Sequence, residues 1–487
     1  MSLFRRTRRS QDPHEAPSPA PPVPLDQALL AAGDGGRESI AVLAGLLLDL
    51  EAAGESDAAL EVLAGAPRVV VRADTAARGY LVPNWATIAA DRLTSSTAGP
   101  LGTALASLHK QGRVREAAVE AMTRAPIPAF VPFLVVRGAD WVPVVRYRAR
   151  GALAELLDAD PRTYLRVAAP IAALVGRRTR GRPVAAQVTA TVYGAPDALL
   201  RDLAGSAGAT LAIPALHAAV ARNLLRPAEL AAIANRVRSA PVARAAAEYA
   251  ARAAVWTGRH AVLESLAGSR TASVRVLGLT GYVRASLPDR AAGSLADPAA
   301  TVRALARDAA RRASIDILSW YRAAVAADPV APGALLGLAE CGTAADAELL
   351  YSRIADASPR IRRAAVQGLR ILDAADPGRL SGVLADPSGA VVREAVKALR
   401  ANADAVPADL LWAQLGSPEL IHRRAAYILL AGQAGSAPLH AALLISEDSD
   451  PVLARRGRAD AARLSTGHEE ARAALAPQAG PVSAPGS

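Results

Sequence analysis

A short sequence pattern occurs three times between Ile354 and Leu430, and its spacing strongly constrains the fold. Each copy places a bulky apolar residue four positions before a small one, and the bulky residues Ile361, Val391 and Ile421 stand 30 residues apart. Four residues are close to one helical turn, so both side chains lie on one face of a helix. A fixed period near thirty residues is typical of a stack of repeated helix pairs.

The same bulky–small pair recurs before and after this stretch. Successive bulky residues between positions 114 and 453 are separated by 31, 97, 32, 28, 59, 30, 30 and 32 residues. The two long gaps are close to three and two periods, so we expect about twelve units in a stack of this kind. The pairs are Val114/Ala118, Val145/Ala149, Val242/Ala246, Val274/Gly278, Val302/Ala306, Ile361/Ala365, Val391/Ala395, Ile421/Ala425 and Leu453/Gly457.

These features predict an all-α fold, an α-α superhelix or solenoid with disordered termini. A cap of different sequence is expected at its start, because a terminal unit must cover the exposed end of the stack. The segment 68–93 is irregular in pattern, and its three valines could form a short strand; in 161–225 helices are expected, but the frame drifts. The expected domains are a basic, Pro-rich tail at 1–24, a helical cap at 25–100, the repeat solenoid at 101–466 and a flexible tail at 467–487.

The composition favours thin, closely packed helices. Apolar residues make up 52% of the 487-residue chain, but aromatic residues only 3%. Stacked helices approach to about 8–10 Å only where the contact residues are small, which is the expected role of the Ala or Gly in each pair.

A dipeptide of Asp or Ser followed by Pro precedes several bulky residues by two to five positions. A side-chain oxygen at the N-cap accepts a backbone N–H, and proline at the first helical position loses no hydrogen bond. We therefore expect each dipeptide to cap the helix that follows. The dipeptides are Asp297-Pro298, Asp386-Pro387, Ser417-Pro418 and Asp450-Pro451.

The motif V-R-x-x-A-x-x-A-L resembles the HEAT repeat and its short bacterial HEAT-like relatives. It is represented by VREAAVEAM from Val114, VRYRARGAL from Val145 and IRRAAVQGL from Ile361. The resemblance extends over residues 101–464, with gaps. It implies a superhelical scaffold that presents a concave surface to other proteins, although some HEAT-like proteins bind DNA or act as enzymes.

Arginines supply the candidate binding residues. One arginine follows the bulky residue in five units and would form a ladder along the stack, either to grip an acidic partner or to pair with a turn Asp or the carbonyl end of a neighbouring helix. We favour the second interpretation, because Val392 and His422 interrupt the ladder. A second cluster, GRRTRGRP, lies between two expected helices. The ladder is Arg115, Arg146, Arg275, Arg303 and Arg362; the candidate partner-binding residues are Arg177, Arg178, Arg180, Arg182, Arg146, Arg275, Arg303 and Arg362.

The charge and the single cysteine indicate the surroundings of the protein. A net charge of +11 fits nucleic acid or another acidic partner, but abundant Arg, Ala, Gly and Pro are also typical of a GC-rich genome. We therefore expect a partner protein, with nucleic acid as the alternative.

The longest apolar run is closed by Asp49, so no membrane insertion is expected. Cys341 cannot form an internal disulfide and fits a reducing cytosol, so we expect a cytoplasmic protein.

Motifs for catalysis, cofactors and metals are absent from the sequence, including H-E-x-x-H, paired C-x-x-C and G-x-S-x-G. We expect no enzyme activity and no cofactor or metal, and the predicted function is a non-catalytic scaffold or adaptor that binds a partner protein on an extended helical surface. A less favoured alternative is that the chain is a HEAT-like alkylpurine DNA glycosylase. A resemblance to those enzymes implies a basic groove with aromatic side chains and a catalytic carboxylate. Asp140, Trp141 and Trp256 could supply these groups, but no motif aligns them. Otherwise, large fillers at unit edges are expected at Trp141, Trp256, Trp320 and Trp412.

Overall fold

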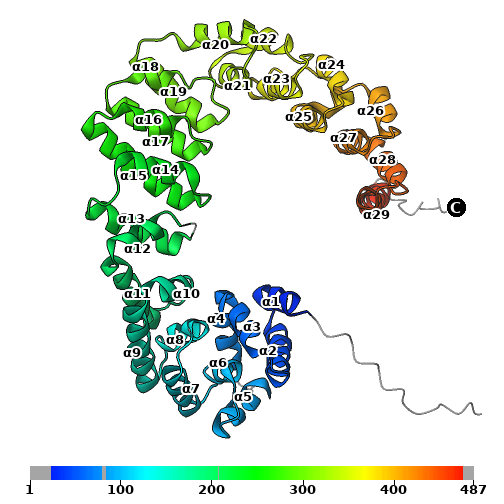
Figure 1. The fold of residues 1–487 in the computed structure, drawn as a ribbon. Helices are drawn as coiled ribbons and strands as arrows, with labels where there is room; N and C mark the ends of the chain where they lie inside the picture. Colours follow the sequence, from blue (N-terminus) through cyan, green and yellow to red (C-terminus); the bar gives the residue numbers. More distant parts are fainter. Residues whose placement is uncertain (1–23, 79–83, 207, 475–487) are drawn as a thin grey trace, which may run out of the picture. The chain divides into compact units, whose positions relative to one another are not determined.

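The computed structural model describes residues 24–78, 84–206 and 208–474, and the regular secondary structure in this part of the chain is helical, without strands (Figure 1). The predicted all-α solenoid is confirmed. Residues 1–23 and 475–487, which hold most of the two predicted tails, lie outside the described residues.

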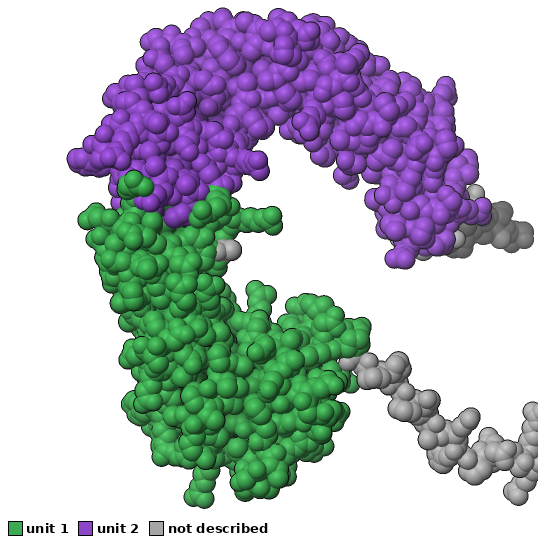
Figure 2. Space-filling view, viewed as in Figure 1, with its two compact units in different colours: residues 1–226, 236–246 green, residues 227–235, 247–487 purple. Residues whose placement is uncertain are grey.

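Two compact units divide the chain and are coloured separately in Figure 2. Unit 1 comprises residues 1–226 and 236–246, and unit 2 comprises residues 227–235 and 247–487. The helices of unit 1 are α1 (Leu25–Asp34), α2 (Arg37–Ala52), α3 (Ser56–Ala64), α4 (Pro67–Ala77), α5 (Asn84–Thr94), α6 (Pro100–Ala106), α7 (Gly112–Arg124), η1 (Pro128–Phe130), α8 (Val131–Arg137), α9 (Pro143–Ala159), α10 (Pro161–Val175), η2 (Thr179–Gly181), α11 (Arg182–Gly194), α12 (Asp197–Ala204) and α13 (Ala209–Ala221).

The division between the units falls in α14 (Pro227–Arg236) and α15 (Ala240–Thr257). Unit 2 continues with α16 (His260–Ala267), α17 (Ala272–Arg284), α18 (Pro288–Ala292), α19 (Ala300–Arg312), α20 (Ile317–Ala326), α21 (Pro332–Cys341), η3 (Ala344–Asp346), α22 (Ala347–Tyr351), α23 (Pro359–Ile371), α24 (Pro377–Leu380), η4 (Ser381–Ala385), α25 (Gly389–Leu399), η5 (Arg400–Ala405), α26 (Ala408–Leu415), α27 (Leu420–Leu430), α28 (Ala437–Ile445) and α29 (Pro451–Ala474).

Twelve consecutive helix pairs, from α6–α7 to α28–α29, follow one another in the described chain, which agrees with the expected number of units. The second helices of successive pairs stack on one another, α7 to α9, α11 and α13 in unit 1, and α17 to α19, α21, α23, α25 and α27 in unit 2. The predicted boundary at residue 100 falls inside unit 1, where α3 packs against α6 and α4 packs against α8 and α10.

The suspected strand in 68–93 is wrong. Its described residues form α4 and α5, and α4 buries Val69 and Val70 on its packed face. Burial of that face outweighs the preference of a valine run for extended backbone. In 161–225 the expected helices are confirmed as α10 to α13. At the other end α29 continues to Ala474, so residues 467–474 of the predicted flexible tail are helical.

The bulky–small pairs are packing positions. The small residue is buried in all nine pairs and the bulky residue in seven, with Val114 and Ile421 half-buried. The two glycines show what the small residue faces. A Cβ atom added to Gly278 would lie 2.5 Å from the backbone nitrogen of Ala267, and one added to Gly457 would lie 2.7 Å from that of Ser446. The small residue therefore packs against the backbone of the first helix in its own pair.

Three of the four predicted caps are instead turns that precede the helix. In each of the three, the side-chain oxygen accepts the backbone N–H of the residue two positions later. That residue is the N-cap, and the helix starts on the residue after it. Only Asp450 caps its helix directly, because it accepts from Leu453 at 2.8 Å and Pro451 is the first helical residue. The three turn contacts are Asp297 with Ala299 at 2.8 Å, Asp386 with Ser388 at 2.7 Å and Ser417 with Glu419 at 3.2 Å.

The seam predicts opposite effects for two glycine-to-alanine substitutions. Gly278→Ala should lower the free energy of unfolding by about 1–3 kcal/mol, because the new methyl group meets backbone that cannot turn aside. Gly151→Ala in α9 is the matched control: its Cβ would meet nothing within 4 Å, so stability should rise by about 0.5–1 kcal/mol. Urea denaturation followed by circular dichroism measures both. Equal midpoints for the two variants would contradict the assigned seam.

Candidate functional site

The ladder arginines form one repeated set of hydrogen bonds. In Arg362, Nη1 donates to the carbonyl oxygens of Asp356 and Ala357, at 2.9 and 3.1 Å, in the turn before its own helix. Its Nε and Nη2 donate to the carboxylate of Asp386 in the next pair, at 2.7 and 2.9 Å. The same two-sided arrangement joins Arg115 to Asp140, Arg275 to Asp297, Arg303 to Glu340 and Arg423 to Asp448.

Arg423 corrects the sequence alignment of the ladder. Its Nη1 contacts the carbonyl oxygens of residues 417 and 418, so this arginine, one position later than expected, continues the pattern. The ladder is therefore interrupted at Val392 but not at the α27 position. His422 approaches the carbonyl oxygen of Asp386 with Nε2 at 3.1 Å, and so contacts the carbonyl that an arginine at position 392 would reach.

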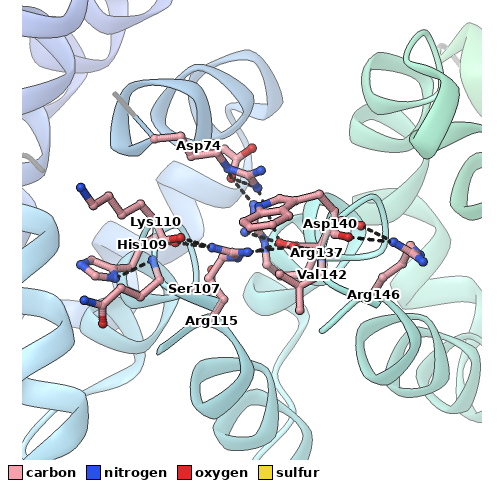
Figure 3. Close-up of polar contacts among 12 residues, drawn as sticks. Asp74, Ser107, His109, Lys110, Arg115, Arg137, Asp140, Val142 and Arg146 are labelled. Carbon is pink, nitrogen blue, oxygen red and sulfur yellow. Dashed lines mark hydrogen bonds and ion pairs between the residues drawn. The ribbon is translucent and has the colours of Figure 1, made fainter. Parts of the chain in front are cut away.

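Arg146 keeps the carbonyl half of this pattern, and the described residues supply no carboxylate for the other half. Its Nη1 donates to the carbonyl oxygen of Asp140 at 2.7 Å (Figure 3). Its guanidinium lies 5.1 Å from the ring centroid of Tyr147. The corresponding turn of the next pair, between α10 and α11, carries Arg178, Thr179 and Arg180 and no carboxylate. Arginines therefore stand in this turn at the place where Asp140, Asp297, Asp386 and Asp448 accept from ladder arginines in their own turns.

Internal pairing occupies most of the ladder's donors. Arg275, for example, uses Nε, Nη1 and Nη2 on two carbonyl oxygens and one carboxylate. Such a guanidinium could contact a partner only by giving up bonds that join two helix pairs. Partner binding stays a prediction for Arg146, Arg275, Arg303 and Arg362.

The clustered arginines differ from the ladder in their surroundings. Arg177 and Arg178 follow α10, Arg180 lies in η2, and Arg182 begins α11. All four side chains are exposed, and none takes part in an ion pair among the described residues. Their positive charges face solvent.

Arg178 and Arg180 line a pocket of about 500 Å³, while Arg177 and Arg182 do not. We call it the Trp141 pocket, after the side chain that forms one wall and is 56% exposed. The Arg115 guanidinium lies 5.7 Å from the Trp141 ring centroid. The lining residues are Asp74, Arg78, Ala139, Trp141, Arg178, Thr179 and Arg180.

A buried ion network reaches the Trp141 pocket through Asp74, which lines it; Figure 3 shows the polar contacts of the network. Asp140 is fully buried and accepts from Arg115 at 2.8 and 2.9 Å, from Arg137 at 2.8 Å and from the backbone N–H of Val142 at 2.9 Å. Burial alone would raise the pKa of Asp140, but these hydrogen bonds and the charge of Arg137 outweigh it, so the pKa is lowered. The carboxylate is held ionised and is fully engaged.

The network continues to α4. Asp74 accepts from Arg78 Nε and Nη2, at 3.2 and 2.9 Å, and from Arg137. Arg137 is fully buried, and its Nε has no hydrogen-bond partner among the described residues. Burial lowers the pKa of Arg137 from its ordinary value. With the pocket-lining arginines, five guanidiniums stand against two carboxylates, so the site is electropositive.

This geometry suits the binding of an anion beside an aromatic or apolar group. It does not suit general base catalysis by Asp140, because that carboxylate is buried and its lone pairs already accept four hydrogen bonds. Trp256, the other tryptophan proposed for a glycosylase site, belongs to unit 2 and is 86% exposed. The filler interpretation is wrong for Trp141 and Trp256, whereas Trp320 and Trp412 are half-buried.

Sequence reasoning found Arg178, Arg180 and Trp141 separately but missed Asp74, Arg78 and Arg137. One signal was available for Arg137, which ends the apolar run FLVVR and so places a charge within a buried helix. Asp74 and Arg78 stand four residues apart on a helix, which is a common surface pairing and gives no sign of burial.

Neither a family model nor a curated protein sequence matches the chain. Among solved structures, human deoxyhypusine hydroxylase in complex with glycerol is 19% identical over 69% of this chain and 99% of that chain, with a TM-score of 0.22. A C-terminal fragment of the Chaetomium thermophilum cohesin loader SCC2 is 13% identical over 85% of this chain and 42% of that one, with a TM-score of 0.31. The karyopherin Kap121p bound to the extreme C-terminus of the phosphatase Cdc14p is 12% identical over 92% and 51%, with a TM-score of 0.24.

TM-scores this low mean that the likenesses establish neither the fold nor the function of the chain. The all-helical solenoid therefore rests on the helices and contacts described above. No helix among the described residues combines the length and apolar character that crossing a bilayer requires.

The ladder predicts a pH-dependent loss of stability. Hydrogen bonds from Arg423 lower the pKa of Asp448 below its ordinary value. The folded-state pKa thus lies below the unfolded-state value of about 3.9, so the stabilisation is present above about pH 4 and is lost as the pH falls through the folded-state pKa. Asp448→Asn should reduce the unfolding free energy at pH 7 by about 1–3 kcal/mol.

Urea denaturation at pH 7 and pH 3 measures this effect, and the difference between Asp448→Asn and the unmodified chain should shrink at pH 3. Glu447→Gln is the control, since Glu447 is exposed and forms no ion pair among the described residues. An Asp448→Asn chain as stable as the control at pH 7 would show that the ladder contributes nothing measurable.

Proposed function

We propose that the chain is a non-catalytic, HEAT-like scaffold or adaptor that binds a partner protein, with the Trp141 pocket as a principal contact. The pocket carries this proposal, because an exposed tryptophan lines it together with Arg178 and Arg180, which have no ion-pair partner in the described part of the chain. Trp, Tyr and Arg dominate the energetics of protein interfaces. A cytoplasmic location belongs to the same proposal, on the evidence of a single cysteine.

The surface beside the pocket supports a protein partner. Val144 and Tyr147, one turn apart on α9, are 39% and 65% exposed, so apolar and aromatic surface extends beyond Trp141. A contact of this composition can bury a hydrophobic centre within a polar rim, as specific protein interfaces do.

The charge distribution favours a protein over a nucleic acid. Extended binding to a phosphate backbone needs positive charge along a track, but the ladder arginines other than Arg146 are bound to carboxylates. Near the pocket, Arg148 is paired with Glu116 and Glu120 on α7. The ladder therefore offers no continuous track of free positive charge. A non-catalytic role is supported by the engagement of the two carboxylates at the pocket. Asp74, which lines it, accepts from Arg78 and Arg137, and Asp140 accepts from Arg115 and Arg137.

Affinity capture tests the proposal. The immobilised full-length chain should retain a partner protein from a lysate of its own cells, and nuclease treatment should not release it. Arg178→Gln/Arg180→Gln and Trp141→Ala should each reduce retention about tenfold or more, as expected when interface anchors are removed. Arg177→Gln/Arg182→Gln removes the same charge from the same loop outside the pocket and should retain the partner.

Retention that is lost with nuclease would favour the nucleic-acid alternative. Equal retention by the two double variants would contradict the pocket as the contact. Matching circular dichroism spectra and melting temperatures for the variants ensure that lost retention reflects binding.

A further inference from the structure

We propose that the Trp141 pocket recognises a phosphoryl group on the partner protein, carried by a phosphorylated side chain in an extended segment. This inference rests on the proposed function and adds the chemistry of what is bound. Three features of the pocket carry it: unpaired donors, a surplus of positive charge and a fixed aromatic wall.

The pocket presents several hydrogen-bond donors that the protein itself does not use. The guanidiniums of Arg178 and Arg180 have no ion-pair partner among the described residues. The backbone N–H groups of Thr179 and Arg180 and the Thr179 hydroxyl likewise have no hydrogen-bond partner among the described residues. Arginine guanidiniums bind phosphate oxygens bidentately.

The charge of the pocket matches a dianion better than a single carboxylate. The carboxylates of Asp74 and Asp140 are already engaged by Arg78, Arg115 and Arg137, and they do not neutralise Arg178 or Arg180. A phosphate monoester carries a charge of about −1.5 to −2 at pH 7 and three acceptor oxygens, whereas a carboxylate carries one charge. In four other turns a carboxylate of the chain takes the ladder arginine of the preceding pair; here the described turn offers arginines, which leaves room for an acceptor on a ligand. The four carboxylates are Asp140, Asp297, Asp386 and Asp448.

Trp141 supplies a fixed wall for the group that bears the phosphate. Its ring lies over the Arg115 guanidinium, which both oxygens of Asp140 hold in place, so the tryptophan is supported from within the protein. Val144 and Tyr147 continue the exposed surface along α9. A free nucleotide would leave this extension uncovered, while residues flanking a phosphorylated side chain would cover it. We therefore assign the ligand as a phosphorylated polypeptide segment.

Direct binding measurements test the assignment on the full-length chain. The probes are fluorescein-labelled pools of 12-residue peptides with phosphoserine, phosphothreonine or phosphotyrosine at the centre and random flanks, each with an unphosphorylated twin. Fluorescence anisotropy should show at least one phosphorylated pool binding about tenfold or more tightly than its twin, as expected for new charge-assisted hydrogen bonds. Arg178→Gln/Arg180→Gln should remove this preference, and Arg177→Gln/Arg182→Gln should preserve it.

The pH dependence gives a second readout. The second pKa of a phosphate monoester is about 6, so affinity for the phosphorylated pool should fall several-fold between pH 7 and pH 5.5 as the dianion gains a proton. Replacing the phosphorylated residue by glutamate should not restore binding to the level of the phosphorylated pool.

Several results would overturn the inference. They are equal affinity for the phosphorylated and unphosphorylated pools, no binding of any phosphorylated pool, equal losses in the two double variants, and competition by AMP as effective as that by phosphorylated peptide, which would indicate a nucleotide site. Phosphatase treatment of the lysate before affinity capture separates this inference from the proposed function. If the partner is retained after phosphatase treatment but lost with Trp141→Ala, the scaffold function stands and phosphate recognition is refuted. If Trp141→Ala does not change retention, both the pocket as the principal contact and phosphate recognition are refuted.

Discussion

The ion pair between a ladder arginine and a carboxylate of the next helix pair is the interaction on which the stack depends. The residue that carries the carboxylate can make three kinds of contact at once, as Asp386 does. The Asp386 carboxylate accepts the backbone N–H of Ser388 in its own turn and two hydrogen bonds from Arg362, through Nε and Nη2, in the preceding pair. The Asp386 carbonyl oxygen lies within hydrogen-bond distance of His422 in the following pair. Because these groups are largely shielded from water, the bonds are stronger than exposed ion pairs, and an unpaired member is correspondingly costly. The register between neighbouring pairs is therefore set by polar contacts, while the apolar seam sets how closely the helices approach.

That arrangement changes the meaning of the positive charge. A net charge of +11 suggests a general affinity for anions, yet the ladder arginines Arg115, Arg275, Arg303, Arg362 and Arg423 join one helix pair to the next. What distinguishes the Trp141 pocket is its departure from the repeat. Arg146 lacks the carboxylate that other ladder arginines have, and the turn that should provide it carries Arg178 and Arg180. At this turn the described residues leave Arg178 and Arg180 without an ion-pair partner, in a pocket that an exposed tryptophan also lines.

The sequence predicted the fold well because its repeat is local. A bulky residue four positions before a small one specifies a helix face, and the 30-residue interval specifies a stack. The errors share a cause, which is that a short pattern is consistent with more than one hydrogen-bond geometry. Asp297-Pro298 has the composition of a helix cap. In the structure Asp297 instead lies two residues before the N-cap residue of α19, Ala299, and accepts its N–H in a turn. The valines of α4 favour a strand in isolation, and only the neighbouring helices make their burial on a helix face more favourable.

By itself, the sequence determined the helical class, the period and the positions of the small residues, because these follow from contacts within one turn or one repeat. Only the tertiary structure decided which charges are paired and which are free. The carboxylate that engages Arg362 lies 24 residues away, and Asp74 meets Arg137 across 63 residues. The Trp141 pocket likewise gathers residues from α4, the turn before α9 and the turn before α11. No periodic pattern encodes such a meeting, because the distance between two charges in space is set by how the helices pack.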